Sequence, residues 1–431
     1  MNKVKKLLFI SPNFPPVNAA DMHRVRQLLF HFDGTRYSID IISIKPEFVD
    51  AYSIDLLLSA NVPANFTLHQ VGAFPAKHTK KFGIGSLSIR SFLHFRKMGN
   101  KLIKRNKYDL IFFSTTATHL LYLGTYWKNK YDIPFVLDIQ DPWVNEYYLS
   151  KPQDEQPPKY LFNLKIDKYL ESRTIPEAAA IISVSSQYND YFKSKYKLSK
   201  DVILKTIPFG VEESDFNLST SVAPPLFKNT KFNIVYIGRG GHDLQQSIIV
   251  LFNSFKVGLL KDSITFSKIH FYFIGTSYAT KGNGVKTIEP IALKMGIHEF
   301  VTEIPDRVSY FKSISLMKSA DLLFIPGSTD ERYTPSKLYP CLLTGRPILS
   351  ISNKKSEMNE LASKISLVSL FHFNDDNIDE DYFNMIAGAI YFYLNGGETV
   401  SEIPKNLISL FSAQSMTIKV FDVFESVISR K

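Results

Sequence analysis

Short apolar segments alternate with helix-like segments along this chain, and the alternation occurs twice. An apolar run of about four to eight residues is typical of a buried strand, whereas a longer segment with one apolar side is typical of a helix. Strands that alternate with helices predict a parallel, doubly wound sheet, whose ligands lie at the carboxyl ends of the strands. The predicted strands are residues 4–11, 37–44, 110–114, 135–139, 181–184 and 202–207 in the first half, and residues 232–237, 269–274, 300–303, 321–326 and 348–351 in the second.

The length of the chain favours two domains, because 431 residues are too many for one ordinary hydrophobic core. We therefore predict an α/β fold with two Rossmann-like, doubly wound domains that face a cleft. The first domain would comprise residues 1–213 and the second residues 231–403, joined by a polar linker at residues 214–230. The tail at residues 404–431 is predicted to be helical and to pack back on the first domain.

Cysteine usage and hydropathy bear on where the protein works. The single cysteine, Cys341, excludes an internal disulfide and suits a reducing compartment. The apolar run near the amino terminus is too short for a signal peptide, and no segment reaches the roughly 18 apolar residues of a spanning helix. We therefore expect a cytoplasmic protein that touches a membrane only peripherally, at its inner face.

The net charge of +10 is concentrated in the first half of the chain. Residues 56–108 hold ten Lys and Arg and no acid, and residues 77–107 space their apolar residues mostly as a helix does. This segment fits a basic amphipathic helix that lies on an anionic membrane surface, and it equally fits a core-packed helix with a solvated basic face. Nucleic acid is a third interpretation, but no recognisable nucleic-acid module accompanies the charge, so we expect no nucleic-acid partner.

A strand followed by an anion-binding helix start is predicted at residues 321–340. Ser336 and Lys337 open the helix directly beyond the strand, and Gly345 ends it before the next strand. A helix start concentrates free N–H groups and positive dipole, and Lys337 adds a full positive charge. The pattern predicts a place for a nucleotide diphosphate.

Five segments carry motifs in a fixed order: residues 10–16 (ISPNFPP), 136–143 (VLDIQDPW), 207–212 (IPFGVE), 237–239 (IGR), and 335–339 (PSKLY) with Gly345 and Pro347. Together they resemble the large retaining glycosyltransferase family four, whose members have the GT-B fold. Each motif is weak alone, but their order and spacing follow the family along nearly the whole chain.

The resemblance implies that the second domain binds a nucleoside-diphosphate sugar and that the first binds a glycan or lipid-linked acceptor. Arg239 and Lys337 would neutralise the departing diphosphate, a task that two preorganised cations perform without a metal ion. The backbone of Gly238, Gly240 and Gly241 would approach the phosphates closely.

Departures from the family pattern affect the expected donor site. Pro340 replaces the acid that usually holds the donor ribose, and Glu331 is the nearby acid that would reach the sugar part instead. Leu244 replaces a lysine usually found beyond the Gly-Arg motif. Arg307 follows the strand where the family cradles the base through backbone groups. These differences leave room for a noncatalytic member of the family.

His119 and Asp141 are the candidate catalytic residues of the first domain. His119 lies near where family members place a histidine that faces the acceptor, and a buried capping histidine is the alternative. Asp138 and Asp141 end a strand, so either is placed to bind acceptor hydroxyls or to steer a proton, although Asp141 before Pro142 also fits a helix cap. Arg24, near the start of the first helix, is placed to help hold the leaving group.

The histidines show no metal-ligand spacing, and the acidic segment at residues 374–381 is interpreted as a solvated loop. No metal and no cofactor are therefore expected. We interpret the chain as a retaining, metal-independent, hexosyltransferase-like glycosyltransferase that acts on a lipid-linked or polysaccharide acceptor in cell-surface glycan synthesis. The alternatives are a GT-B sugar-nucleotide epimerase, an inverting transferase, and a noncatalytic GT-B-like scaffold.

Overall fold

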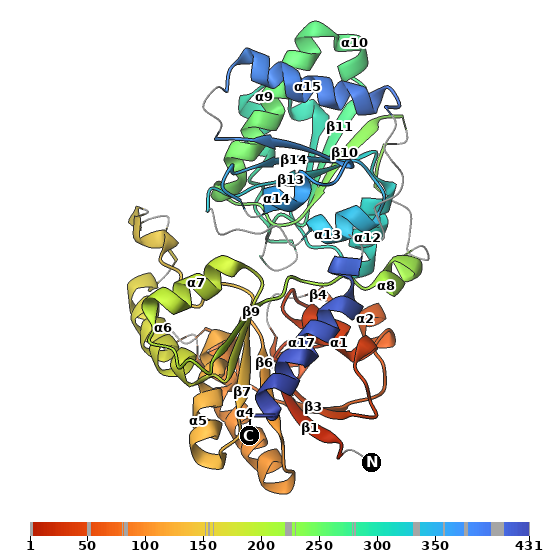
Figure 1. The fold of residues 1–431 in the computed structure, drawn as a ribbon. Helices are drawn as coiled ribbons and strands as arrows, with labels where there is room; N and C mark the ends of the chain where they lie inside the picture. The colour runs from red at the N-terminus through yellow and green to blue at the C-terminus, as the bar shows by residue number, and fades with distance from the viewer. Residues whose placement is uncertain are drawn as a thin grey trace. The chain divides into compact units, whose positions relative to one another are not determined.

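The protein forms two compact units, which are described here each by itself (Figure 1). The first comprises residues 1–210 and 411–431, and the second comprises residues 211–410. The structure is a computed structural model that describes residues 3–49, 53–79, 81, 85–150, 152–153, 156–157, 159–219, 226–228, 230–277, 279, 282–330, 337–356, 358–374, 378–397 and 409–430.

The first unit is built on a seven-stranded, entirely parallel sheet with the order β5-β3-β1-β6-β7-β8-β9. The central strand β1 (Lys5–Ile10) pairs on one side with β3 (Tyr37–Ile44) and on the other with β6 (Leu110–Ser114), and Leu7 lies opposite Ile39 and Leu110. The other strands of the sheet are β5 (Thr67–Val71), β7 (Phe135–Ile139), β8 (Ala180–Ser183) and β9 (Ile203–Thr206), and β2 (Val17–Asn18) pairs separately with β4 (Ser53–Ile54).

Helices cover both faces of this sheet. The helices are α1 (Met22–His31), α2 (Leu56–Ala60), α3 (Ala76–Thr79), α4 (Leu87–Arg105), α5 (Tyr122–Tyr131), α6 (Tyr160–Thr174), α7 (Ser186–Lys195) and α17 (Ala413–Ile428). Because successive side chains of a strand point to opposite faces, Leu8 and Ile10 join the core beneath α4, α5 and α7, whereas Leu7 and Phe9 join the core beneath α1 and α17. Such two-sided burial explains why the strands are continuous apolar runs.

The carboxyl-terminal helix α17 belongs to the first unit. Phe424 packs edge-on against Phe9 and Phe112, with ring centroids 6.0 and 5.0 Å apart. Glu425 of the same helix accepts hydrogen bonds from Lys5 and Tyr37, and from Arg36 at 2.9 Å. The prediction that the tail packs back on the first domain is confirmed.

The second unit is built on a six-stranded parallel sheet with the order β12-β11-β10-β13-β14-β15. Its strands are β10 (Phe232–Ile237), β11 (Ile269–Ile274), β12 (Val301–Ile304), β13 (Leu322–Pro326), β14 (Ile348–Ser352) and β15 (Val368–His372). Its helices are α8 (Glu213–Leu218), α9 (Gln245–Lys261), α10 (Ser263–Phe266), α11 (Glu289–Lys294), α12 (Tyr310–Ser319), α13 (Leu338–Leu343), α14 (Met358–Ala362) and α15 (Glu380–Leu394). The helices α9 and α15 pack together over one core, to which Phe252, Phe271 and Ile390 contribute.

Several elements differ from the prediction. The acids at residues 379–381 do not form a solvated loop, because Asp379 caps α15 by accepting a hydrogen bond from Tyr382 N at 3.0 Å. Residue 214, where we expected the linker to begin, lies in α8, and Asp215 of that helix accepts a hydrogen bond from Tyr310 of α12 at 2.9 Å. The helix expected at Ser336 and Lys337 starts at Leu338 and has six residues.

Two helical glycines offer a matched test of packing. A Cβ on Gly99 of α4 would lie 2.1 Å from the ring of Trp127, which is fully buried. A Cβ on Gly388 of the surface helix α15 would meet no atom within 4 Å. We expect Gly99→Ala to lower the melting temperature of the first unit, since a rigid overlap costs about 1–3 kcal/mol and exceeds the gain in helix propensity. Gly388→Ala should raise stability by about 0.5–1 kcal/mol, and calorimetry of both variants checks the pair. Equal melting temperatures for the two variants would contradict the packing described for α4.

Candidate functional site

Four loops meet at the carboxyl edge of the second sheet. The strand order places β10 between β11 and β13, so the chain changes direction of winding beside β10, where open α/β sheets bind ligands. Gly240 N, after β10, donates to Thr276 O, after β11, at 2.7 Å. Thr329 N, after β13, donates to Asp243 O at 2.9 Å. The loop after β12 includes Arg307, whose backbone lies beside Gly275.

Arg239 is held by an ion pair that the sequence analysis did not predict. Its two terminal nitrogens donate to the two carboxylate oxygens of Asp243, at 2.8 and 2.6 Å. Ser328 Oγ donates to the same carboxylate at 2.6 Å. Burial raises the pKa of Asp243, but the hydrogen bonds and charge of Arg239, with the bond from Ser328, outweigh burial and lower the pKa below its usual value. The planar fork of Arg239 is therefore held in a fixed orientation, and its charge is already balanced by a carboxylate.

Lys337 lies at the start of α13, in the same set of loops. Burial lowers the pKa of its ammonium group, and the nearby charge of Arg307 lowers it further, against the opposing effect of Cys341. Two cations that repel each other at a sheet edge favour an anion between them, because an anion would raise the lowered pKa of Lys337 again. A helix of six residues adds little dipole, so the attraction comes mainly from the side chains.

The glycines after β10 are required by the packing of the protein itself. A Cβ on Gly238 would lie 2.4 Å from the hydroxyl of Tyr236, and one on Gly240 would lie 2.5 Å from Thr287 Oγ1. Tyr236 in turn donates to Arg239 O at 2.9 Å. The loop is thus shaped to hold Arg239, whether or not a phosphate contacts its backbone. Ser336 and Glu331 lie outside the described residues, and their proposed contacts stay predictions.

Glu303 supports this edge and was missed by the sequence analysis. The carboxylate is buried and accepts hydrogen bonds from the backbone of Thr287, Ile288 and Glu289, at 3.0, 2.8 and 2.8 Å, and from Thr276 Oγ1 at 2.7 Å. It therefore ties the start of α11 to the loop after β11. An acid inside an otherwise apolar strand was the available signal in the sequence.

In the first unit, a buried polar network lies at the corresponding carboxyl edge. Asp21 precedes α1 and accepts hydrogen bonds from Asn13 at 2.9 Å, Thr115 Oγ1 at 3.2 Å and Thr116 N at 3.3 Å. Burial raises the pKa of Asp21, although these hydrogen bonds oppose the rise. The network sits beside β1 and β6, where this sheet changes its direction of winding. The sequence analysis missed Asp21, because nothing in the local pattern marks a carboxyl group as buried.

Asp138 and Arg24 form a structural pair in the same network. Both side chains are fully buried, with Arg24 Nε 2.9 Å from Asp138 Oδ2. Ser114 Oγ also donates to Asp138, at 2.7 Å. Arg24 further donates to Ile207 O at 2.8 Å and lies over the ring of Phe209. Each side chain is enclosed by the chain, so neither residue is available to a ligand. This differs from our expectation that Asp138 would bind the acceptor and that Arg24 would help hold the leaving group.

Asp141 is exposed, and no helix begins at Pro142. The described chain runs without helix from there to a short 3-10 turn at Tyr147–Ser150. The helix-cap interpretation of Asp141 is therefore wrong, and a role toward an acceptor stays a prediction.

His119 links three elements of the first unit. Its Nδ1 lies 2.9 Å from the hydroxyl of Ser88, at the start of α4, and its Nε2 lies 3.6 Å from Asp167 of α6. Burial lowers the pKa of His119, so the ring is neutral near pH 7. Burial also raises the pKa of Asp167, to about 6, against a hydrogen bond from Trp143 and with help from the charge of Glu171. The histidine does not merely cap a helix, since it lies between two helices, and its catalytic role stays a prediction.

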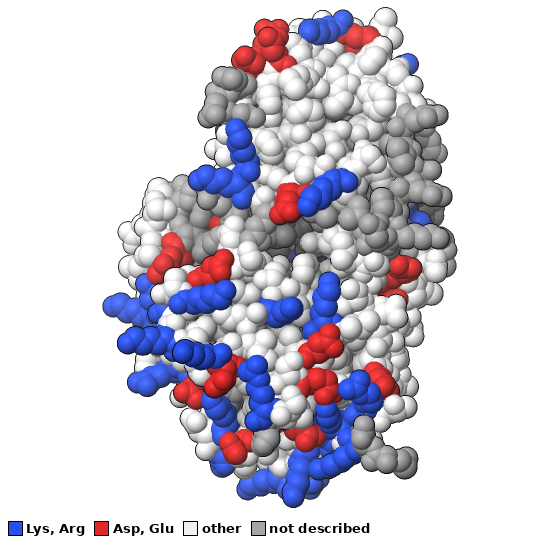
Figure 2. Space-filling model, viewed as in Figure 1, with Lys and Arg blue, Asp and Glu red and all other residues white. Residues whose placement is uncertain are grey.

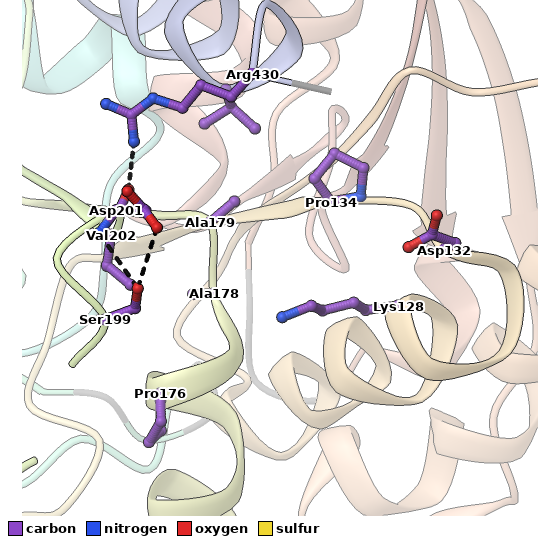
Figure 3. A pocket seen from close by; sticks show the side chains of 11 residues that line it. Lys128, Asp132, Pro134, Pro176, Ala178, Ala179, Ser199, Asp201, Val202 and Arg430 are labelled. Atoms are coloured by element: carbon purple, nitrogen blue, oxygen red, sulfur yellow. Dashed lines mark hydrogen bonds between the residues drawn. The ribbon is translucent and has the colours of Figure 1, made fainter. Parts of the chain in front are cut away.

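A separate pocket of about 350 Å³ lies at the opposite edge of the first sheet (Figure 3). Pro134, Ala179 and Val202, which line it, directly precede β7, β8 and β9. The pocket is therefore at the amino-terminal edge, away from the residues described above. Arg430 closes one side by donating to the backbone oxygen of Asp201.

The part of the chain that the structure describes holds neither a metal-ligand cluster nor a membrane-spanning helix. No group of three or more His, Cys, Asp and Glu is arranged there to hold a metal ion. No helix in the same residues is both long enough and apolar enough to cross a membrane.

Solved structures share the fold over nearly the whole chain. Sucrose-phosphate synthase from Thermosynechococcus elongatus matches with a TM-score of 0.60 at 12% identity, covering 99% of this chain and 100% of that one. An E. coli structure described as trehalose-6-phosphate bound with UDP-2-fluoro glucose matches with a TM-score of 0.61 at 11% identity, covering 97% and 99%. A putative UDP-N-acetylglucosamine 2-epimerase from Listeria monocytogenes matches with a TM-score of 0.54 at 9% identity, covering 100% and 98%.

These neighbours have the GT-B fold, and the predicted fold class is confirmed. No family model matches the sequence, and no curated protein matches it closely enough to count as a relative. Membership of family four stays a prediction.

The Arg239 ion pair predicts a pH-dependent loss of stability. The pKa of Asp243 is depressed in the folded state from an ordinary value of 3.8, so the pair stabilises the fold above that pH and is lost as the pH falls below it. We expect Arg239→Ala to destabilise the second unit by about 1–2 kcal/mol at neutral pH, since it strands a half-buried carboxylate. The difference from wild type should shrink as the pH falls below about 4, measured by thermal unfolding.

Lys364→Ala is the matched control for Arg239→Ala. It removes an exposed Lys364–Glu360 pair of 2.9 Å, and it should change stability little at either pH. A loss in Arg239→Ala that is equally large at low and neutral pH would contradict the account given for Asp243.

The raised pKa of Asp167 predicts the opposite pH trend. Folding raises the pKa of the Asp167 carboxyl from 3.8 to about 6, so the folded state holds this proton more tightly than the unfolded state does. The carboxyl therefore destabilises the fold increasingly as the pH rises from about 4 to about 6. We expect Asp167→Asn to gain stability over wild type between about pH 4 and pH 7, measured by chemical unfolding across that range. Asp190→Asn, on the exposed side of α7, should show no such trend. A difference for Asp167→Asn that does not change with pH would show that Asp167 is not perturbed in the fold.

Proposed function

We propose that this protein is a glycosyltransferase that moves a sugar from a nucleoside-diphosphate sugar to a lipid-linked or polysaccharide acceptor. The observation that carries the proposal is the convergence of Arg239, Arg307 and Lys337 at the carboxyl edge of the second sheet, beside the change of winding. Similar folds support it, since one neighbour is described as bound with UDP-2-fluoro glucose and another is named a sucrose-phosphate synthase. Membership of retaining family four, inferred from the motifs, belongs to the same proposal.

The donor diphosphate would bind against these cations. Arg239 would present its planar fork to phosphate oxygens, either sharing it with Asp243 or leaving that carboxylate. Burial weakens the hold of Lys337 on its proton, and an anionic ligand would strengthen it. As the glycosidic bond breaks, negative charge develops on the leaving diphosphate, and preorganised cations stabilise it most in that state.

The chemistry we propose is transfer with retention and without metal. The acceptor hydroxyl would attack from the face that the diphosphate leaves. The departing phosphate oxygen would take the hydroxyl proton while the acceptor oxygen forms the new glycosidic bond. His119 and Asp141 of the first unit are the candidates to orient the acceptor, and His119 is already fixed by Ser88.

We further propose that the enzyme works at the cytoplasmic face of a membrane, in cell-surface glycan synthesis. The basic helix α4 buries Phe95 and Leu102 in the core and leaves Arg96, Lys97 and Lys101 exposed. The helix is therefore core-packed and still presents a basic outer face, and this exposed charge supports the membrane interpretation.

Two other functions have specific support. A neighbour named as a putative UDP-N-acetylglucosamine 2-epimerase makes epimerisation a candidate. The pairing of Arg239 with Asp243, together with Pro340 in place of the usual acid, favours a noncatalytic scaffold as the third candidate. An inverting transferase would differ from the first proposal in the anomeric configuration of its product.

Nucleotide binding separates these candidates. We expect UDP or GDP, tested by calorimetry with their sugars, to bind the wild-type protein, and Arg239→Ala and Lys337→Ala to lose at least about tenfold in affinity, since each removes a charged contact to phosphate. Lys364→Ala, just beyond the end of α14, should bind as wild type does. Product analysis then distinguishes transfer with retention, inversion and epimerisation. Failure of every nucleotide to bind would favour the scaffold, and full binding and turnover in both variants would overturn the proposed diphosphate site.

A further inference from the structure

The helix α6 exposes large apolar side chains near its start. Leu161 and Phe162 are 58% and 64% exposed, and Tyr169, two turns further, is exposed as well. Single exposed apolar residues are common on protein surfaces, but adjacent leucine and phenylalanine side chains directed into solvent are costly. The buried side of α6 is satisfied by Tyr160 and Leu164, so the exposed pair does not serve the fold of this unit.

Basic residues surround these apolar side chains. Lys159 and Lys165 flank the pair in sequence and are exposed. Lys168, one turn further, is partly balanced by Glu146 at 2.5 Å, and Arg173 lies over the ring of Tyr169. Figure 2 shows Lys and Arg gathered along the outer edge of the first unit, over α6 and α7. Leucine and aromatic side chains between lysines match the interfacial zone of an anionic bilayer.

The helix α4 presents the same combination on the same face of the sheet. Ile89 and Leu93 are exposed near its start, followed by the exposed Arg96 and Lys97. Both helices contact the 3-10 turn that carries His119, and this histidine lies between Ser88 of α4 and Asp167 of α6. Each helix therefore carries exposed apolar side chains and one partner of a partly buried polar link through His119.

We propose that α4 and α6 together form one membrane-docking surface, in which Leu161 and Phe162 enter the headgroup region while lysines of both helices contact anionic lipid. The inference rests on the membrane association proposed above and deepens it, because it names α6 as a second half of the surface. An anionic lipid surface fits α4 and α6 better than an acidic protein partner does. The exposed apolar residues lie on two separate helices, and a flat bilayer can contact both helices more readily than a single groove on a protein can. Docking through both helices would also hold His119 at a fixed depth below the lipid.

Co-sedimentation with vesicles tests the surface. The probes are vesicles of equal parts phosphatidylglycerol and phosphatidylcholine, and vesicles of phosphatidylcholine alone. We expect the double variant Leu161→Ser, Phe162→Ser to lose about tenfold or more in partition onto the anionic vesicles. The matched control is Leu260→Ser, Ile264→Ser, which changes a pair on the second unit that is even more exposed, at 86% and 78%. This control should partition as wild type does, and melting temperatures check that both variants are folded.

Charge variants distinguish binding to anionic lipid from nonspecific hydrophobic adsorption. Lys165→Glu should weaken partition onto anionic vesicles by about fivefold or more and leave partition onto neutral vesicles unchanged. The α6 double variant could partition as wild type does while Arg96→Glu with Lys97→Glu in α4 abolishes binding. That result would overturn the proposed role of α6 and leave α4 as the docking helix. Partition lost equally in the Leu260 and Ile264 control would overturn it as well.

Two further outcomes bear on the proposal as a whole. Absence of wild-type binding to anionic vesicles would overturn the docking surface, while nucleotide binding by calorimetry would still decide the transferase on its own. Sedimentation velocity without lipid is the final measurement. If the wild-type protein is a dimer and the α6 double variant is a monomer, the surface is a contact between two copies of this chain and the lipid proposal is overturned.

Discussion

The first sheet needs cover on both of its faces, and the last helix of the chain supplies part of that cover. All neighbouring strands in this sheet run parallel, and a parallel sheet of apolar strands is stable only when other elements cover both of its faces. The helix α17 packs Val420 and Phe424 onto the face formed by Phe9 and Phe112. The second unit is therefore inserted into the sequence of the first, and the core of the first unit is completed only when residues 411–431 return to it.

The two sheets differ in the polar groups at their carboxyl edges. In the second unit, three cations, Arg239, Arg307 and Lys337, lie on the loops at this edge, and Arg239 is paired with Asp243. In the first unit, Asp21 sits among hydroxyl and amide groups, and its pKa is raised because burial is not offset by a cation. A cationic edge suits a diphosphate, whereas a network of buried hydrogen-bonding groups suits a rigid frame around sugar hydroxyls. This division agrees with the proposed roles of donor and acceptor units.

His119 connects the interior of the first unit to its surface. It joins α4 and α6 through Ser88 and Asp167, and both helices expose apolar and basic residues on their outer sides. Any displacement of either helix would therefore alter the hydrogen bonds of the histidine. In the proposed docking arrangement, such a link would tie the position of the acceptor to the depth at which α4 and α6 contact lipid.

Most of the parallel strands, the two doubly wound units and the packing of the tail could be predicted from the sequence, because apolar runs and their spacing report burial directly. The edge strands β5 and β15 were not predicted. The sequence also indicated Arg239 and Lys337 as candidate phosphate-binding residues, since each lies in a motif that follows a buried strand. The structure was needed to show that Arg239 is paired with Asp243, that Asp138 is enclosed by Arg24, and that α6 keeps apolar side chains in solvent. The enclosure of Asp138 and the exposure of α6 depend on which distant segments meet, and local patterns do not report this. Arg239 and Asp243 are only four residues apart, but their pairing depends on the conformation of the loop that holds them.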